Sequence, residues 1–373
     1  MQSKISYPVS EPDLSGNERK YLVDAFDSGW ISSKGKYIEG FETNFANFIG
    51  SKYSVSCSNG TTALHLAVKA LGIGRDDEVI VPNLTFASPA NAVLYEGAKP
   101  VLVDIDREYW GIDPNQIESA LTSRTKAIIA VHLYGHPCNM GEIMKIARRH
   151  DLRVIEDCAE AHGAKYSGQK VGTFGDVSCF SFYGNKIITT GEGGMVLTDK
   201  EETAEKMRKL RDHGMLSERR YWHDDVGYNY RMTNLQAAIG VAQIENPEKK
   251  IEKRRWIAQK YAEFIDESIV MQPELKWAYN VYWIPTFLLT TCLDRHTRDL
   301  VIKKMFEKGI ETRPTFFPLS EMPPYASATK FKNSSYVADI GLSLPATNRM
   351  YEDDIRFISE TLNDISRKLI RTC

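Results

Sequence analysis

Short apolar runs alternate with amphipathic stretches through the first 200 residues, and this alternation constrains the fold more than any other feature. The runs are nearly continuous in Val, Ile, Leu and Ala, which is typical of strands covered on both faces. They lie at residues 52–57, 77–82, 99–105, 125–133, 152–158, 176–182 and 193–198. Helical patterns lie between them at residues 61–71, 88–95, 140–150 and 200–214. This order predicts an α/β fold with a mostly parallel sheet.

The pattern changes after about residue 215. The following segments predict, in order, two helices, one strand and two more helices, at residues 234–245, 249–267, 282–289, 300–309 and 351–371. We therefore predict two domains joined by a long helix. The large α/β domain, with an N-terminal arm, covers residues 1–245, and a smaller α+β domain covers residues 246–373.

Charge and composition argue against several kinds of partner. The formal net charge of −2 gives no reason to expect nucleic acid or an acidic membrane surface. No stretch approaches the roughly 20 apolar residues of a membrane span, and the N-terminus does not resemble a secretory signal. The six cysteines form no CxxC pair, so we expect free thiols, a cytoplasmic protein and no metal centre.

Two loops that follow predicted strands carry polar residues suited to ligand binding. The first, SNGTTALHLA at 58–67, opens a helix, where exposed N–H groups would bind an anion; simple helix capping is the alternative. The second, VIEDCAEAHG at 154–163, places Asp157 at the carboxyl end of a strand. Asp157 would pair with a cationic ring nitrogen or cap a helix. We interpret His162 as structural.

Lys186 stands in SFYGNKIITTGEGG, residues 181–194, between a strand end and a cluster of glycines. One interpretation is an incidental lysine in a turn. The other is a lysine that bonds covalently to a carbonyl cofactor, with Ser181 near a phosphate and the glycines allowing close approach. Burial and nearby cations would lower the pKa of such a lysine and free its lone pair.

Two further segments carry candidate polar residues. In VGYNYRMTNLQAAIG, residues 226–240, Asn229 and Arg231 precede a helix that Thr233 or Asn234 would cap. In GIETRPTFFPL, residues 309–319, Arg313 is either solvated or a clamp for an anion, because its guanidinium matches carboxylate and phosphate.

Taken together and in order, six segments resemble the sugar aminotransferases of the DegT/DnrJ/EryC1/StrS family. They are SNGTTAL, PNLTFASPAN, EDCAEAHG, FSFYGNKIITTGEGG, GYNYRMTNLQAAIG and GIETRP. The resemblance runs from about residue 12 to the last helix. It implies the fold type I architecture of pyridoxal-phosphate enzymes, which is aspartate aminotransferase-like, with a mixed, mostly parallel sheet.

The resemblance also implies roles for individual residues. Lys186 matches the lysine that bonds to pyridoxal phosphate, and Asp157 matches the carboxylate that keeps the pyridine nitrogen protonated. The remaining cofactor contacts are a stacking ring, a group near the ring's hydroxyl and a phosphate cradle, implied at Phe86, Glu160, Gly60, Thr61 and Ser181.

Other residues are implied to act between subunits or on the substrate. Asn229 matches an asparagine that reaches the phosphate in the neighbouring subunit, which implies a homodimer with shared active sites, or a tetramer of two dimers. Arg231 is a candidate for the same contact. Trp30, Ser32, Arg231 and Arg313 are candidate substrate-binding residues, with simple packing as the alternative for the first two.

Four segments resemble more specifically the GDP-perosamine synthases: FYGNK, GKYIEGFE, RRYWHDDVGYNYRMTN and VYWIP. In FYGNK, Tyr183 stands where the family commonly has His. This resemblance implies amination of GDP-4-keto-6-deoxy-D-mannose, with L-glutamate as donor. A UDP- or dTDP-4-keto-6-deoxyhexose is the alternative acceptor. Relatives that act as 3-dehydratases have histidine in place of Lys186, so we expect a transaminase. A non-catalytic sensor with the same fold is a remote alternative.

Overall fold

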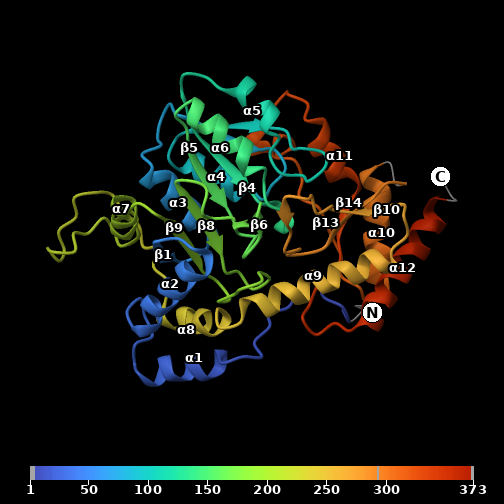
Figure 1. Ribbon diagram of the computed structural model, residues 1–373, viewed down its shortest axis with the longest axis horizontal. Coiled ribbons are helices and arrows are strands. Elements are labelled where there is room, and N and C mark those ends of the chain that lie inside the picture. The colour runs from blue at the N-terminus through green and yellow to red at the C-terminus, as the bar shows by residue number, and fades with distance from the viewer. Residues whose placement is uncertain (1–4, 292–293, 371–373) are drawn as a thin grey trace.

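A seven-stranded sheet forms the centre of the computed structural model, which describes residues 5–291 and 294–370 (Figure 1). Its order is β1–β9–β8–β5–β4–β2–β3. The strands are β1 (Tyr53–Cys57), β2 (Glu78–Pro82), β3 (Lys99–Val103), β4 (Thr125–Val131), β5 (Arg153–Asp157), β8 (Val177–Ser181) and β9 (Gly194–Thr198). Of these seven, β9 alone runs against the others. The predicted mostly parallel sheet is confirmed.

Strands β2, β4 and β5 contribute side chains to two separate cores, because neighbouring residues point to opposite faces of a sheet. In β4, Ile128 and Ala130 pack in a core with α5 (Pro114–Ala120) and α6 (Met140–Arg149). Ala127 and Ile129 pack in the larger core on the other face. Helices therefore cover both faces, which explains the nearly continuous apolar runs.

The helices of the larger core are α2 (Lys36–Ile49), α3 (Gly60–Ala70), α4 (Ser88–Tyr95), α7 (Glu201–Arg211) and α8 (Asn234–Gln243). The sequence analysis did not predict α1 (Glu18–Asp27), α2, α5 or α11 (Lys332–Ile340). The signal for α2 was present, since Tyr37, Phe41 and Phe45 recur every four residues and are buried on one face. Both α1 and α2 pack against α8.

The long helix α9 (Pro247–Phe264) leads from the central sheet to a second, antiparallel sheet of order β10–β12–β14–β13 (Figure 1). This sheet has its own apolar core, shared with α9 and two further helices. Its elements are β10 (Ile269–Met271), β12 (Thr286–Leu289), β13 (Arg313–Pro314), β14 (Gly341–Ser343), α10 (Arg295–Glu307) and α12 (Glu352–Ile370). The predicted boundary after residue 245 falls between α8 and α9, and it stays a prediction.

Two backbone pairings join segments that lie far apart in the sequence. A small sheet pairs β11 (Ala278–Tyr279) with β6 (Lys165–Tyr166), which also pairs with β7 (Gln169–Lys170). Near the N-terminus, Tyr7 forms a bridge with Ile310 and so lies against the second sheet's region. Among the described residues, no helix combines the length and the apolarity that a membrane crossing requires.

Candidate active site

A cavity of about 840 Å³ lies where the carboxyl ends of β5 and β8 meet the start of α3. Ligands collect at such strand ends in open α/β sheets. Eight predicted site residues line it: Gly60, Thr61, Phe86, Asp157, Glu160, Ser181, Lys186 and Arg313. The fold thus brings together residues from five separate segments of the sequence.

Lys186 extends into this cavity from the connection between β8 and β9. Its Nζ lies 3.8 Å from Glu160 Oε1 and 3.6 Å from the centroid of the Trp283 ring. Burial lowers the pKa of Lys186, and this effect outweighs the opposing charges of Glu160 and Asp157. The chain therefore holds one amine, poised to lose its proton, inside a ligand-sized cavity.

The glycines after Lys186 are needed by the local geometry. Gly191 has a φ of +84°, in the left-handed region that favours glycine. At Gly194 an added Cβ would lie 2.3 Å from the carbonyl oxygen of Asn59, so any side chain would push β9 away from the start of α3. The predicted close approach of backbones around the lysine is present.

Two buried carboxyl groups face Lys186 from the β5 side. Asp157 Oδ1 accepts a 3.0 Å hydrogen bond from the Ala159 N–H, and burial raises the pKa of Asp157. Glu160 Oε2 accepts a 2.8 Å hydrogen bond from the Tyr134 N–H, and burial raises the pKa of Glu160 to about 7. Both groups lack the water that normally stabilises a carboxylate, so a cation placed between them would bind well.

The capping interpretation of the polar loop before α3 is confirmed, and anion binding there stays a prediction. Asn59 caps the helix, accepting from the Thr62 N–H at 2.9 Å, while Thr62 Oγ1 accepts from the Asn59 N–H. The cap leaves Gly60 and Thr61, the first two helical residues, lining the cavity. An added Cβ on Gly60 would lie 2.7 Å from the Cβ of Ser181, so only glycine lets helix and strand close the cradle.

Aromatic rings form one wall of the cavity. Phe86 is 57% exposed and lies 5.9 Å from Phe316, which stacks on Tyr134 at 5.4 Å; Tyr134 in turn stacks on Trp283 at 6.4 Å. The sequence analysis gave no role to Phe316, Tyr134 or Trp283. The aromatic run after Arg313 contains Phe316 and the segment VYWIP contains Trp283, whereas no sequence signal singled out Tyr134.

The residues of this cavity fit pyridoxal phosphate. Lys186 offers the amine, Asp157 a buried carboxylate for a protonated ring nitrogen, and Phe86 an exposed face for stacking. The helix start at Gly60 offers N–H groups and a positive dipole end to the phosphate. The space that Gly60 leaves beside Ser181 is where a side chain would otherwise fill the cradle.

The loop with Trp30 and Ser32 lies elsewhere, against the start of α8. Asn234 binds it through its own N–H to the Ser32 carbonyl at 2.6 Å and through Nδ2 to the Trp30 carbonyl at 2.7 Å. Trp30 is 56% exposed and borders a second cavity, of about 510 Å³, together with Gly35. Within the one described chain, neither Trp30 nor Ser32 lines the first cavity.

Asn229 and Arg231 also lie outside the lining of the first cavity. Asn229 is exposed and forms a backbone bridge with Asp212, whose carboxylate pairs with Arg231. Thr233 caps α8, as one of the two predicted options had it. Arg313 does line the first cavity, where its guanidinium pairs with Glu311 at 3.0 Å.

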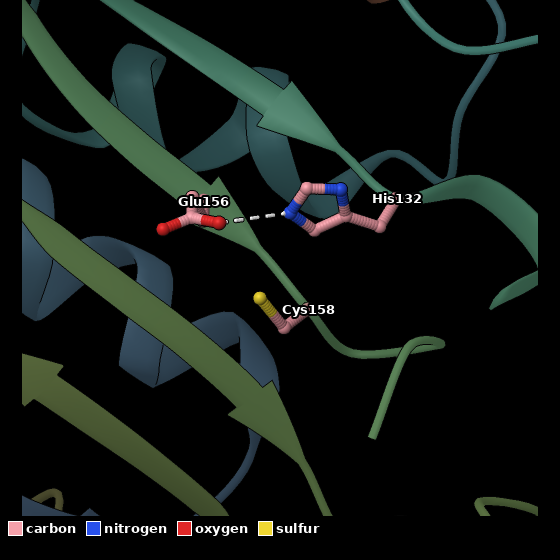
Figure 2. Close-up of side chains that lie close together, drawn as sticks. All are labelled: His132, Glu156 and Cys158. Carbon is pink, nitrogen blue, oxygen red and sulfur yellow. Dashed lines mark hydrogen bonds and ion pairs between the residues drawn. The ribbon is translucent and has the colours of Figure 1, made fainter. Parts of the chain in front are cut away.

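One group of buried side chains has the composition of a metal site. In the described part of the chain, the only such group is formed by His132, Glu156 and Cys158 (Figure 2). His132 Nε2 lies 3.2 Å from Glu156 Oε2, and His132 Nδ1 accepts from the Cys138 N–H. The Glu156 carboxylate also accepts three backbone N–H groups of residues 172–175. Hydrogen bonds thus already use these atoms, and we interpret the cluster as structural.

Comparison with known proteins identifies the family. Residues 12–363 match the model of the DegT/DnrJ/EryC1/StrS aminotransferase family. The chain belongs to this family. It is 48% identical to a GDP-perosamine synthase of Caulobacter vibrioides (96% of this chain, 97% of the relative) and 45% identical to one of Escherichia coli O157:H7 (96% and 98%).

Among solved structures, the chain superposes on a Streptococcus pneumoniae protein described as a sugar aminotransferase, in its PLP-form. The TM-score is 0.92 at 25% identity, and the match covers 97% of this chain and 99% of that one. The family, the fold class and the prediction of an aminotransferase are thereby confirmed.

Proposed function

We propose that this aminotransferase transfers the amino group of L-glutamate to C4 of GDP-4-keto-6-deoxy-D-mannose and releases GDP-perosamine. The cofactor is pyridoxal phosphate. The observation that carries the chemistry is the Lys186 amine, buried in a ligand-sized cavity between two carboxyl groups and an aromatic face. The choice of sugar is supported by the two GDP-perosamine synthases, which match nearly the whole chain.

Bound pyridoxal phosphate supplies an electron sink for the carbanion that forms beside the transferred nitrogen. Lys186 is the residue that would hold the cofactor. With donor bound, its free amine would accept the proton from the donor's α-carbon and later return a proton, acting first as base and then as acid. Burial suits Lys186 to this task because it favours the neutral amine.

Other residues orient the reacting groups. Asp157 keeps a proton on the ring nitrogen, and Gly60, Thr61 and Ser181 hold the phosphate at the start of α3. Phe86 would stack on the ring, and Glu160 would hold the side of the ring that carries its hydroxyl. Arg313 binds the donor's carboxylate or the nucleotide's diphosphate, since both match its guanidinium.

The active form is a homodimer with shared sites. Asn229 is exposed and is not among the residues that line its own subunit's cavity, so it is available to a second subunit. Arg231, Trp30 and Ser32 lie in the same region and would contact the second subunit's substrate. Large apolar side chains are exposed around α1, which supports a covered surface there: Leu14, Val23, Phe26, Trp30 and Ile31.

We place the enzyme in the cytoplasm. Four cysteines, Cys57, Cys138, Cys158 and Cys179, are buried as free thiols, which fits a reducing compartment.

The visible absorption spectrum tests the proposal. We expect purified protein loaded with pyridoxal phosphate to be yellow, to bleach on addition of L-glutamate, and to recover its band with GDP-4-keto-6-deoxy-D-mannose. The K186A variant is the control and should give no lysine-bound band. If the band recovers only with a UDP- or dTDP-linked keto sugar, that sugar is the acceptor and GDP-4-keto-6-deoxy-D-mannose is not. A wild-type protein without any band would contradict the aminotransferase mechanism itself.

A further inference from the structure

Trp283 contacts the reactive lysine in two ways. The face of its ring lies under the Lys186 amine, with Nζ 3.6 Å from the ring centroid. Its Nε1–H donates a 2.8 Å hydrogen bond to the carbonyl of Asn185, the residue directly before Lys186. A single side chain therefore contacts both the amine and the backbone that carries it.

Trp283 is itself fixed in place. It is buried, and its backbone N–H donates to the Tyr134 carbonyl at 3.1 Å, while the two rings stack within 12° of parallel. Gly135 makes this approach possible, because an added Cβ would lie 3.0 Å from the Trp283 nitrogen. The same Tyr134 donates its N–H to Glu160. Tyr134 thus orients both groups that lie beside the Lys186 amine.

Two groups beside Nζ partly offset the desolvation that otherwise disfavours an ammonium ion in this cavity. An aromatic face attracts a cation through its quadrupole, and the effect grows when water is excluded. Glu160 adds a carboxyl group 3.8 Å away. Lys186 needs such a point, because its four-carbon chain has many rotamers once it is not bonded to the cofactor.

We propose that Trp283 and Glu160 form a resting site for the Lys186 amine, occupied whenever the substrate has displaced the lysine from the cofactor. Trp283 is then a positioning residue for the proton transfer and for the return of the lysine. This inference rests on the proposed function, because it assumes that the bond between Lys186 and the cofactor breaks and forms again in each catalytic cycle.

Two substitutions separate the contacts of Trp283. W283F keeps an aromatic face and removes the N–H donor, whereas W283M keeps apolar volume without the face. W277F is the matched control, because Trp277 packs on Tyr109, His136 and Tyr166 and does not line the cavity. The first readout is the pH dependence of the rate at which cofactor-free protein forms the lysine-bound yellow band with added pyridoxal phosphate.

Only the neutral amine attacks the aldehyde, so this rate reports the protonation of Lys186. If the ring stabilises the ammonium, W283M moves the midpoint of the rate profile to lower pH, and W283F and W277F move it little. We also expect W283M to lower kcat about tenfold while the KM for L-glutamate changes less than about twofold. Unchanged midpoint and kcat in W283M would overturn the inference.

A second measurement avoids the risk that W283M does not fold. Incorporation of 5-fluorotryptophan keeps the ring shape but weakens its negative face. We expect the midpoint of fluorinated wild-type protein to lie at lower pH than that of unlabelled wild-type protein. Fluorinated and unlabelled W283F should have the same midpoint. Equal shifts in both proteins, or none in either, would also overturn the inference. Absence of the yellow band in unlabelled wild-type protein would instead contradict the proposed function.

Discussion

At the scale of single residues, Glu160 and Lys186 form a buried pair whose pKa values shift toward each other. Burial lowers the pKa of the lysine and raises that of the glutamate to about 7, so both effects move the pair away from full separation of charge. In water the same two groups would both be ionised at neutral pH. Desolvation, rather than their mutual attraction, decides the state of this pair.

This gives a prediction for the cofactor-free protein. Folded Glu160, with a pKa of about 7, binds a proton that the unfolded chain, near 4.5, has already lost. The free energy of unfolding therefore falls as pH rises through this window, by about 3 kcal/mol from this group. E160Q, which keeps an oxygen for the Tyr134 N–H, removes that fall.

Chemical denaturation of wild type and E160Q between pH 4 and 8 measures the difference, with cofactor absent from both. E142Q changes an exposed glutamate on α6 and should parallel wild type. Identical pH dependence in wild type and E160Q would show that Glu160 is ionised in the folded state throughout.

At the scale of elements, α3 and β8 make close contact at the place where we propose that the phosphate binds. The helix start meets the strand end where Gly60 faces Ser181, and there is no room for a methyl group between them. Alanine normally favours a helix over glycine, so intrinsic propensity and packing oppose each other at this position. Packing decides, because a displaced helix start would also displace the N–H groups to which we assign phosphate binding.

We therefore expect G60A to weaken binding of pyridoxal phosphate at least tenfold and to destabilise the fold by about 1–3 kcal/mol. G40A is the matched control: Gly40 lies within α2, and an added Cβ would meet only Val241 at 3.7 Å. G40A should keep its affinity and gain stability slightly. Equilibrium dialysis and thermal unfolding check both variants, and full cofactor affinity in G60A would refute the role assigned to the contact.

At the scale of the whole molecule, the predicted site residues fall into two groups. Lys186 and its neighbours line one cavity, whereas Asn229 and the Trp30 loop lie around the start of α8. A shared site in a homodimer with two-fold symmetry would join them, because each subunit then gives one group to each site.

Complementation tests this arrangement. K186A and N229A are each expected to be inactive. When they are co-expressed with different tags and purified through both tags, each mixed dimer holds one site with an intact lysine and an intact asparagine. We expect about half of the wild-type activity. Activity no greater than the sum of the parents would place Asn229 in its own subunit's site, and failure to recover doubly tagged protein would contradict the dimer.

Much of the fold could be predicted from the sequence because its signals are local. Buried parallel strands need nearly continuous apolar runs, so the positions of the strands along the chain could be predicted. The helix α2 was missed although Phe41 and Phe45 follow helical spacing, and the β9 reversal has no local signature. Lys186, Asp157 and the loop before α3 stood out because each breaks the apolar pattern at a strand end.

The sequence by itself thus determined the sheet's elements and which reactive side chains stand at their ends. Tertiary structure alone decided what surrounds Lys186. Trp283, about 100 residues away, reaches the amine because the chain returns from the second sheet and pairs its backbone with Tyr134. No local periodicity predicts such a contact, since it depends on how the segment before β12 packs against the carboxyl ends of the central strands. The pKa shifts follow from that packing, because burial removes the water that would otherwise fix the charges of Lys186 and Glu160.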